Sequence, residues 1–586
     1  MSAENWHART LAFLDAQQFA EAEESCRRLL GLEPRHAKGL ANLGFILQSR
    51  GAFDEAVRCY RAALESDPAL AQVWYNLGIL SGALKQSAAV EQLLRATQLQ
   101  PGRAEWQAAL GTAYEAEGKP FEALACIQSA IRLDPDFAPA QESLGILLAN
   151  TGEAEAAIPA FKRALALDPA RQSASSNMLF ALNYILSIEP GTVFQEHRAW
   201  ADRCSASLPA TAAHANRADP ERRIRLAYVS PDFRNNAVFF FIDPVLQHRD
   251  RSRFEVICYS DVEAEDALTT RLRGMTDGWH ATAWLSNEAL AERIRADAID
   301  ILVDLAGHTA GGTRMPMFAR KPAPVQVTWL GYLNTTGLRT MDYRLADWHA
   351  CPAEMDRYHS ERVVRLPDSQ WCYAPVPGGP AVGPLPALET GSVTFGSFAN
   401  LPKVTPEVVA LWSRVLQEVP RSRMVMVGRG MSQLSERFTD RFARGGVAAD
   451  RLEFREFMGV QDYLSFHNRI DINLDTFPFT GGTTSMHSLW MGVPVVTLAG
   501  RHVPSRGGAS ILGVLGMEEL IAATPDQYVA IAASLARGLQ RLGDMRRSLR
   551  ARLEASPLCD GARFARNIEV AYRDMWRAWC APRAPA

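Results

Sequence analysis

The segment 471–498, DINLDTFPFTGGTTSMHSLWMGVPVVTL, contains the pattern that decides the fold. At its start, Ile470, Ile472 and Leu474 alternate with polar residues, which predicts a buried strand. A loop follows, and residues 485–491 are then expected to form a short helix that Gly492 ends. Residues 493–498 are apolar and β-branched, as is typical of the next strand in a parallel sheet. The segment therefore predicts strand, glycine turn, helix and strand.

This layout is one that places a phosphate group at the start of a helix. The free N–H groups and the positive end of the helix dipole attract an anion, and Gly481 and Gly482 allow the backbone to come close to it. The other interpretation is that Thr483 and Thr484 only cap the helix and that the glycines only turn the chain. The spacing by itself leaves both interpretations open.

Length and composition restrict the class of protein. A chain of 586 residues is too long for one core, so we expect roughly three or four folding units of ~150 residues. The 62 basic and 65 acidic residues nearly balance, which argues against nucleic acid or a membrane surface as the main partner. The nine cysteines form no CxxC pair, so neither a metal site nor a disulfide framework is expected. With no signal-peptide core or long apolar stretch, we expect a cytoplasmic protein.

The first third of the chain repeats. Prolines at 34, 68, 101, 135 and 169 recur every 33 or 34 residues, the period of tetratricopeptide repeats. Glycines at 44, 78, 111 and 145 fall where two helices of a repeat must approach closely. We predict about five repeats over residues 1–171. The concave face of such an array most often binds an extended peptide or protein, and the alternative is a scaffold or a homodimer surface.

The repeat pattern fades after residue 171. Residues 173–187 and 196–207 favour further helices, and the stretch 209–220 is polar, alanine-rich and bounded by prolines. We therefore predict a helical extension and linker over 172–220.

The rest of the chain alternates strand and helix signals in two series. Apolar, β-rich runs predict the strands of both series. The first series comprises 225–230, 254–260, 299–305 and 325–329, and the second comprises 392–398, 424–427, 452–454, 470–474 and 493–498. A break rich in proline and glycine at 375–386 separates them. We predict two Rossmann-like lobes, 221–385 and 386–580, the second with a closing C-terminal helix.

Two motifs are missing from these lobes. No GxGxxG follows a strand, which disfavours a dinucleotide redox enzyme, and the absence of a P-loop disfavours an ATPase. Ligands of such sheets lie at the carboxyl ends of the strands. Two facing lobes without either motif suit a nucleotide-sugar glycosyltransferase of the GT-B type.

Several longer motifs carry a family resemblance. They are SPDF at 230–233, GHTAGG at 307–312, RKPAPVQVTWLGYLNTTGLRTMDYRLAD at 320–347, TFGSFANLPKVTP at 394–406 and LDTFPFTGGTT at 474–484. With the repeats, they make the chain resemble protein O-linked N-acetylglucosamine transferases, and most closely the SPINDLY-type and bacterial branch. Some members of that branch transfer fucose from GDP-fucose. The resemblance covers nearly the whole chain.

The resemblance implies roles for matched positions. Lys403 matches a lysine that neutralises the diphosphate of the leaving nucleotide, where a cation is needed because charge develops as the sugar departs. Other matched positions are expected to bind the nucleotide sugar: Gly482, Thr483 and Thr484 beside the diphosphate, Asn400 at the phosphates or the sugar, Gly307 and His308 facing the sugar, and Ser505 and Arg506 at a second helix start. The alternatives are a solvated loop lysine at 403, a structural histidine at 308 and a surface charge at 506.

Three positions depart from the family pattern. Asn236 stands where the family usually has a histidine near the sugar and acceptor, and asparagine cannot take a proton near neutral pH. His487 replaces an acidic residue that helps to hold the nucleotide ribose. Tyr463 replaces a histidine beside the base, and its ring can stack on uracil or guanine. Asp232 or His308 could serve as the base instead, or the donor phosphate could accept the proton.

The sequence thus predicts an enzyme that transfers N-acetylglucosamine from UDP-GlcNAc, with inversion, to serine or threonine of a protein held by the repeats. It needs no cofactor or metal in this interpretation. One alternative is a protein O-fucosyltransferase that uses GDP-fucose. The other is a catalytically inactive scaffold that binds a nucleotide sugar, which the changes at Asn236 and His487 leave open.

Overall fold

The structure is a computed structural model that describes residues 1–209, 213–309 and 314–581. The predicted linker 209–220 and the motif at 307–312 thus lie partly outside the described residues. The chain forms two compact units. One comprises Met1–Leu147 and Lys162–Pro169, and the other comprises Leu148–Phe161 and Ala170–Ala586. Within the described ranges, no helix is both long and apolar enough to cross a membrane.

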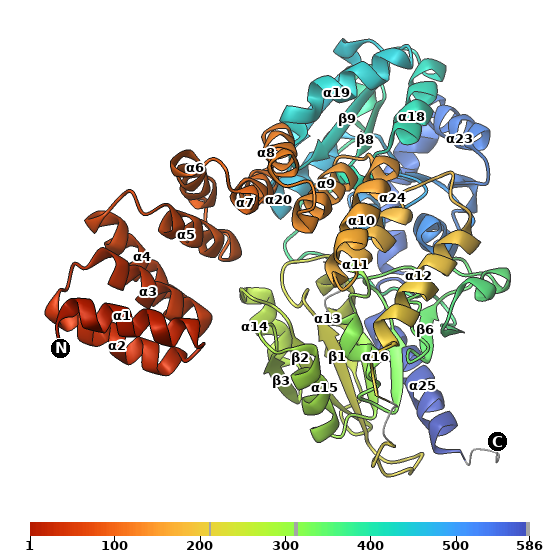
Figure 1. The fold of residues 1–586 in the computed structure, drawn as a ribbon. Helices are drawn as coiled ribbons and strands as arrows, with labels where there is room; N and C mark the ends of the chain where they lie inside the picture. Colours follow the sequence, from red (N-terminus) through yellow and green to blue (C-terminus); the bar gives the residue numbers. More distant parts are fainter. Residues whose placement is uncertain (210–212, 310–313, 582–586) are drawn as a thin grey trace. The chain divides into compact units, whose positions relative to one another are not determined.

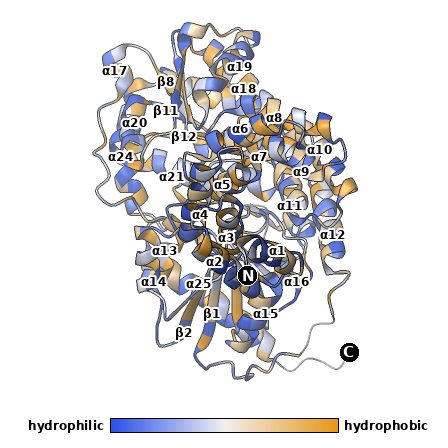
Figure 2. Ribbon diagram, turned by 60° about the vertical axis from the view of Figure 1, so that its left-hand side comes forward, coloured by the Kyte–Doolittle hydropathy of each residue, from blue (hydrophilic) through white to orange (hydrophobic). Residues whose placement is uncertain are grey.

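The repeats are five consecutive helix pairs (Figure 1). Their helices are α1 Ala3–Asp15, α2 Phe19–Leu32, α3 Ala37–Ser49, α4 Phe53–Ser66, α5 Ala71–Ala83, α6 Ala89–Leu99, α7 Ala104–Ala116, α8 Pro120–Leu133, α9 Ala138–Asn150 and α10 Ala154–Leu167. Hydrophobic and hydrophilic residues both occur along the repeat helices (Figure 2), and α4 and α6 are clearly amphipathic, as expected of helices that bury one face. The prediction of five repeats is confirmed.

Gly44 and Gly78 have the packing role that the repeat pattern predicted. A Cβ atom added to Gly44 would lie 2.7 Å from the ring of Tyr60, and one added to Gly78 would lie 2.6 Å from Leu93. These distances are too short for any side chain, so glycine is what allows the paired helices to touch. Two further helices, α11 Gln172–Leu182 and α12 Pro190–Ser205, follow the repeats.

The first lobe is built on a sheet of seven parallel strands in the order β3-β2-β1-β4-β5-β6-β7. The strands are β1 Ile224–Ser230, β2 Phe254–Ser260, β3 Gly278–Ala281, β4 Ile301–Asp304, β5 Val325–Thr328, β6 Tyr343–Ala346 and β7 Arg362–Arg365. The helices between them are α13 Phe239–His248, α14 Ala267–Gly274, α15 Asn287–Ala296, α16 Met315–Ala319 and the 3₁₀ helix η2 Ala353–Tyr358. The short strands β3, β6 and β7 were not predicted. Both β3 and β7 are half-exposed and mixed in polarity, so neither gives the apolar signal of a central strand.

The second lobe has six parallel strands in the order β10-β9-β8-β11-β12-β13. Its strands are β8 Thr394–Ser397, β9 Arg423–Gly428, β10 Leu452–Glu456, β11 Ile472–Leu474, β12 Val495–Leu498 and β13 Ile521–Ala522. Its helices are α17 Pro386–Thr390, α18 Pro406–Glu418, α19 Met431–Arg444, α20 Val460–Phe466, α21 Thr483–Trp490, α22 Gly507–Val514, α23 Pro525–Arg537, α24 Leu539–Glu554 and α25 Gly561–Cys580. The 3₁₀ helices are η3 Leu401–Lys403, η4 Ala449–Arg451, η5 His467–Arg469, η6 Val503–Ser505 and η7 Glu518–Leu520. The predicted pair of Rossmann-like lobes is confirmed.

The stretch 471–498 folds as predicted, with one shift. Helix α21 begins at Thr483, two residues earlier than expected, and Gly482 is its N-cap. Gly492 follows the helix with a φ of +74°, and a Cβ there would lie 2.6 Å from the carbonyl oxygen of Arg546. Because only glycine adopts this conformation at no cost and fits this space, the helix ends here.

The last helix returns to the first lobe. Although α25 follows the second lobe in sequence, it packs against α13. Arg573 donates from Nη1 to the carbonyl oxygens of Pro220 (2.7 Å) and Arg222 (2.8 Å), and Trp576 Nε1 donates to Asp219 O (2.9 Å). The end of the chain thus holds the segment that leads into β1.

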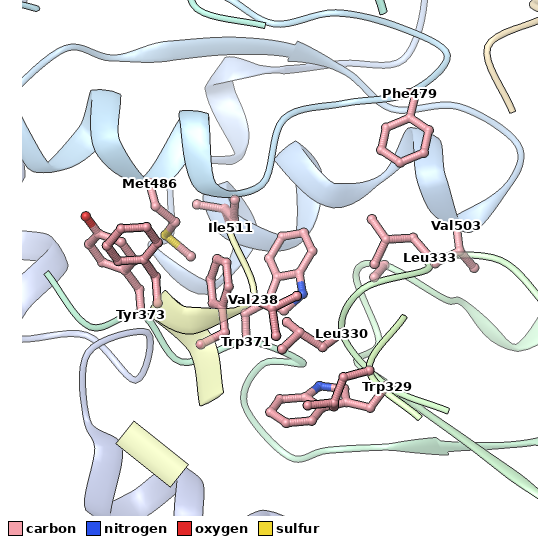
Figure 3. Packing of buried hydrophobic residues seen from close by; sticks show 14 of the residues in the cluster. Val238, Trp329, Leu330, Leu333, Trp371, Tyr373, Phe479, Met486, Val503 and Ile511 are labelled. Carbon is pink, nitrogen blue, oxygen red and sulfur yellow. The ribbon is translucent and has the colours of Figure 1, made fainter. Parts of the chain in front are cut away.

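A single buried core runs through both lobes. Figure 3 shows a part of it, in which Val238 and Leu330 of the first lobe lie close to Trp371, with Met486 and Ile511 of the second lobe nearby. The two lobes are therefore packed together by shared apolar contacts as well as by polar ones.

Candidate active site

The strand order of the second sheet identifies the place where a ligand is expected. The order reverses between β8 and β11, and open parallel sheets bind ligands outside the carboxyl ends of strands at such a point. Asn400 and Lys403 follow β8, and residues 480–484 follow β11. The residues that the sequence predicted to hold a diphosphate thus meet at the switch point.

Lys403 is held against the loop that leads into α21. Its Nζ donates a hydrogen bond to Thr480 O (2.8 Å) and lies 4.2 Å from the ring centroid of Phe479, a distance suited to a cation–π contact. Burial lowers the pKa of Lys403 to about 8, and the nearby carboxylate of Asp475 opposes this shift. An anion bound here would restore the charged form of the lysine.

Thr480 connects this loop to a second helix start. Its N–H donates to Pro504 O (3.0 Å), and its hydroxyl donates to the same carbonyl (3.2 Å). The hydroxyl oxygen also accepts from Gly508 N (3.2 Å), in the first turn of α22. The starts of α21 and α22 are therefore tied together next to Lys403. The sequence analysis did not single out Thr480, because its main interactions involve backbone groups that sequence does not reveal.

Asp475 shapes the loop between β11 and α21. Its Oδ1 accepts from Gly481 N (2.7 Å) and Thr476 N (2.9 Å), and its Oδ2 accepts from Thr497 Oγ1 (2.8 Å). Burial raises the pKa of this carboxyl, while these donors act in the opposite direction. A Cβ at Gly508 would lie 2.6 Å from Asp475 Oδ2, so the glycine is required for the close approach of α22.

The start of α21 presents N–H groups that come before the first hydrogen bond of the helix. The first bond of the helix runs from Met486 N to Gly482 O (3.0 Å), and no side chain caps it. The N–H groups of Thr483, Thr484 and Ser485 therefore precede the intrahelical ladder. Since Thr483 and Thr484 are the first residues of the helix and not its cap, the simple capping interpretation does not describe them.

Buried polar atoms without a partner surround this helix. Among the described residues, Ser485 Oγ and His487 Nε2 are buried and have no hydrogen-bond partner, and the same holds for the hydroxyl of Tyr373. Burial lowers the pKa of His487 to about 4, so its imidazole is neutral at neutral pH. Unpaired buried polar groups are costly, and a cluster of them is typical of a surface that binds a polar ligand.

Aromatic rings enclose His487. Its ring centroid lies 5.2 Å from that of Phe240, 5.5 Å from that of Tyr463 and 5.7 Å from that of Tyr373. Phe240 comes from the first lobe, so both lobes contribute to this cluster. The structure thus brings Tyr463 and His487, two of the three departures from the family pattern, into direct contact.

The other predicted residues of the second lobe differ in their surroundings. Asn400 is exposed, and its carbonyl accepts from Lys403 N (3.0 Å) at the start of η3. Arg506 donates from Nε to His349 O of the first lobe (2.9 Å) and from Nη1 to Gly500 O (3.2 Å). Ser505 is buried and bonds to His502. Arg506 thus links the two lobes in this conformation.

The carboxylate of Asp304 organises the turn after β4 in the first lobe. The carboxylate of Asp304 accepts from Gly307 N (2.9 Å), Ala306 N (3.0 Å) and Thr328 Oγ1 (2.8 Å). Gly307 has a φ of +57°, and a Cβ there would lie 2.3 Å from Tyr332. The geometry requires a glycine at this position for backbone reasons alone.

His308 is enclosed next to this turn. Its Nδ1 accepts from Ser176 Oγ (3.0 Å), and its Nε2 donates to Thr336 O (3.0 Å), the tautomer that the carbonyl requires. The ring is fully buried and lies edge-on to Trp200 at 4.5 Å. Burial lowers the pKa of His308 to about 3. Both ring nitrogens are thus used to join α11 to the loop after β5, which is the arrangement of a structural histidine.

Asp232 and Asn236 lie together in the loop after β1. Asn236 donates from Nδ2 to Asp232 Oδ1 (2.8 Å), and its Oδ1 accepts from Val238 N (3.2 Å) just before α13. Both side chains are half-exposed. The structure therefore brings together the members of each lobe, Asp232 with Asn236 in the first and Lys403 with the start of α21 in the second. Where the described chain is concerned, no group of three His, Cys, Asp or Glu side chains is arranged to hold a metal ion.

Comparison with known proteins adds the family to this geometry. The family described as Glycosyl transferase family 41 matches residues 205–372 and 386–568, more than half of the chain. The chain belongs to glycosyl transferase family 41. Tetratricopeptide repeat families match residues 44–83 and 108–171. The family membership and the repeats that the sequence predicted are thus confirmed.

Members of this family in plants are similar over most of the chain. The probable UDP-N-acetylglucosamine–peptide N-acetylglucosaminyltransferase SPINDLY of Solanum lycopersicum is 41% identical over 416 residues, 70% of this chain and 45% of that protein. Its counterpart in Arabidopsis thaliana is 40% identical over 422 residues, 71% of this chain and 46% of that protein. The chain thus spans less than half the length of these relatives.

A bacterial member of the family has the same fold. The solved structure of a mutant of the Thermobaculum terrenum O-GlcNAc transferase superposes with a TM-score of 0.83 and is 37% identical. The match covers 88% of this chain and 98% of that one. The chain therefore shares its fold with this solved O-GlcNAc transferase structure.

Proposed function

We propose that this family 41 protein transfers a sugar from a nucleoside diphosphate to a hydroxyl group of a protein. The observation that carries the proposal is the convergence of Lys403 with the starts of α21 and α22 at the switch point of the second sheet. One cation and two helix starts form a site for a diphosphate. The relatives are named as probable peptide N-acetylglucosaminyltransferases, which supports a protein as the acceptor.

Lys403 has the central role in the proposed mechanism. The acceptor oxygen attacks the anomeric carbon as the bond from that carbon to the diphosphate oxygen breaks, and the bonding electrons stay with the diphosphate. The proton of the acceptor hydroxyl passes to the carboxylate of Asp232 or to the donor phosphate. Lys403 and the free N–H groups of Thr483 and Thr484 stabilise the charge that develops there. Since the lysine is partly desolvated in the free protein, the diphosphate gains more from it than it would from a lysine in water.

In this proposal, residues of the first lobe contact the acceptor hydroxyl. His308 uses both ring nitrogens in bonds within the protein, so we assign it a structural role. Asp232 presents a half-exposed carboxylate oriented by Asn236, and we assign to it the contact with the acceptor hydroxyl. The helices of the repeats would deliver the acceptor segment. Gly307, Asn400 and Arg506 are proposed to shape the site and not to take part in the chemistry.

The donor that we propose first is UDP-GlcNAc, in agreement with the names of the relatives. GDP-fucose is the second candidate. The cluster of Tyr463, Tyr373 and His487 has lost the carboxylate of the usual family pattern, and its rings can stack on either base. A scaffold without activity would not need Lys403 beside the helix start, but it would still bind a nucleotide.

The test combines binding with turnover. The melting temperature of the purified chain is measured with UDP, GDP, UDP-GlcNAc and GDP-fucose, since a ligand at about 100 times its Kd stabilises the folded state by ~2.7 kcal/mol. Release of the nucleoside diphosphate from each donor is then followed. We expect stabilisation and turnover with uridine ligands. A selective response to guanosine ligands would favour GDP-fucose as the donor. Binding without turnover would favour the inactive scaffold. No binding of any of the four ligands would refute the proposal.

A further inference from the structure

The turn between α9 and α10 is a place where a repeat element contacts the loop of Lys403. Residues Leu148–Phe161 belong to the same compact unit as the two lobes, whereas the flanking parts of α9 and α10 belong to the unit of the repeats. The turn at 151–153 lies within the former segment. The turn therefore belongs to the last repeat in sequence, but it packs in the unit that contains the two lobes.

The same turn occurs in earlier repeats. Gly51, Gly118 and Gly152 have φ values of +79°, +74° and +79°, and each of their N–H groups donates to the carbonyl three residues before it. The residue after each glycine donates to the carbonyl five residues before it: Ala52 to Leu47, Lys119 to Tyr114 and Glu153 to Leu148. Backbone geometry thus explains the glycine in all three turns.

What distinguishes Gly152 is its surroundings. A Cβ at Gly152 would lie 2.7 Å from Val404 O and 3.3 Å from Leu401 O, whereas a Cβ at Gly51 would have nothing within 4 Å. Leu401 and Val404 flank Lys403 and are themselves buried, at 7% and 1% exposure. The backbone that carries Lys403 therefore rests directly on the turn of the last repeat.

A charged contact fixes the same turn. The Oε1 atom of Glu153 accepts from the guanidinium groups of Arg437 and Arg441 on α19. The equivalent positions of earlier turns are Ala52 and Lys119, which cannot make such a contact. Leu401 completes the packing, since it also lies within 3.3 Å of the Cβ position of Gly428 at the end of β9. The turn is thus bonded on one side to α19 and packed on the other against η3.

We propose that Gly152 and Glu153 are positioning residues that set the placement of Lys403, so that the last repeat is a part of the catalytic machinery. This inference rests on the role of Lys403 proposed above. Neither residue touches the donor. They act through the backbone of residues 401–404, which a side chain at position 152 would displace.

The experiment uses the full chain and two glycine variants matched in backbone strain. Gly152→Ala and Gly51→Ala place the same side chain at the same φ, but only the first meets residues 401–404. Release of UDP from UDP-GlcNAc, or of GDP from GDP-fucose, is measured with water as the acceptor. We expect Gly152→Ala to lower kcat about 10- to 100-fold, since a misplacement of ~1 Å can cost that much, with little change in the donor KM. Gly51→Ala should stay within about twofold of the unmodified chain, because its strain acts far from residues 401–404.

Two further measurements keep the test decisive. Amide hydrogen exchange of the segment 400–405 should rise in Gly152→Ala and not in Gly51→Ala, whether or not the chain turns over a donor. If Gly152→Ala does not fold, Glu153→Gln should also lower kcat, while Glu155→Gln, two residues further along at the start of α10, should not. Equal kcat and equal exchange in the two glycine variants would overturn the inference. Full activity in Lys403→Ala would instead refute the proposed role of the lysine.

Discussion

The two lobes share one architecture but treat polar groups at their switch points differently. In the first lobe, Asp304 accepts hydrogen bonds from three residues and both nitrogens of His308 have protein partners. In the second, Ser485 Oγ and His487 Nε2 are buried without a partner within the described chain. Buried polar groups that are all satisfied stabilise a fold, whereas those left unsatisfied cost free energy that a ligand can recover. The contrast assigns a structural role to Asp304 and His308 after β4, and a binding role to the unpaired polar atoms on α21.

The largest expected effect tests the second lobe. Lys403→Ala should lower kcat by roughly 10²–10³-fold, the usual loss when one group that stabilises a developing charge is removed. Thermal stability should not fall, because the lysine is partly desolvated and its pKa is lowered by burial. Turnover is measured as release of the nucleoside diphosphate, with the melting temperature as control. An active variant would remove the main reason for placing the chemistry here.

The second prediction tests the first lobe. His308→Ala should lower the free energy of unfolding by about 2–4 kcal/mol, because it leaves Ser176 and Thr336 without their partners and opens a cavity beside Trp200. Urea denaturation measures this loss, and Ser176→Ala should show a part of it. The folded fraction should keep kcat within a few-fold. A loss of kcat as large as that of Lys403→Ala would show that His308 takes part in catalysis, and it would contradict the structural role assigned to this residue.

A pH dependence follows from the lowered pKa of Lys403, which is about 8 against an ordinary value of 10.5. A bound diphosphate favours the charged lysine, so affinity for UDP should be constant below pH 8 and fall above it, by at most about tenfold per pH unit. Titration calorimetry between pH 7 and 9 measures this. The Lys403→Arg variant should bind UDP with an affinity that does not fall above pH 8. If its affinity still falls with the same slope, another group causes the pH dependence.

The same shift has a consequence for stability with a definite sign. Between pH 8 and 10.5 the unfolded chain holds the lysine proton more tightly than the folded one. The contribution of Lys403 to the free energy of unfolding therefore rises with pH in this window. Saturating UDP should cancel that rise, because it stabilises the charged form in the folded state.

The smallest expected effect concerns His487. His487→Phe keeps the contacts with Phe240, Tyr373 and Tyr463 but removes Nε2. If this atom serves the nucleotide, affinity for UDP should fall about fivefold, roughly 1 kcal/mol, while stability stays equal or increases, because a buried unpaired group is gone. Calorimetry measures the affinity for UDP and denaturation measures the stability of the variant. An unchanged affinity would show that the ring of His487 has only a structural role.

The sequence predicted the fold where its signals are periodic. The proline period predicted the repeats, and apolar runs predicted the central strands of both sheets. The edge strands β3 and β7 were not predicted, because they are short and half-exposed. Their packing against the neighbouring strand defines them more than their own residues do. The start of α21 was misjudged by two residues for a related reason, since Gly482 caps the helix through its backbone alone.

The site was predictable to the extent that it uses motif residues. Lys403 lies beside Thr480, in the loop that leads into the helix of Thr483 and Thr484. Thr480 was not predicted, because its carbonyl is what receives Lys403 and any residue provides a carbonyl. The partners of His308 could not be predicted either, because Ser176 lies 132 residues away in the sequence. The sequence pattern of its helix indicates only an extension of the repeats. The roles of these residues stay predictions until the variants above are measured.

The return of α25 to the first lobe affects how the protein is made. Arg573 bonds to Pro220 across a separation of 353 residues, so the entry to β1 receives its partner only after the whole second lobe has been synthesised. At roughly 5–20 residues per second, the ribosome needs about 20–70 s for this stretch. During that time, the face of α13 that α25 covers is open to solvent and to other chains. A nascent first lobe is therefore a natural client for chaperones, and release from them should coincide with the emergence of α25.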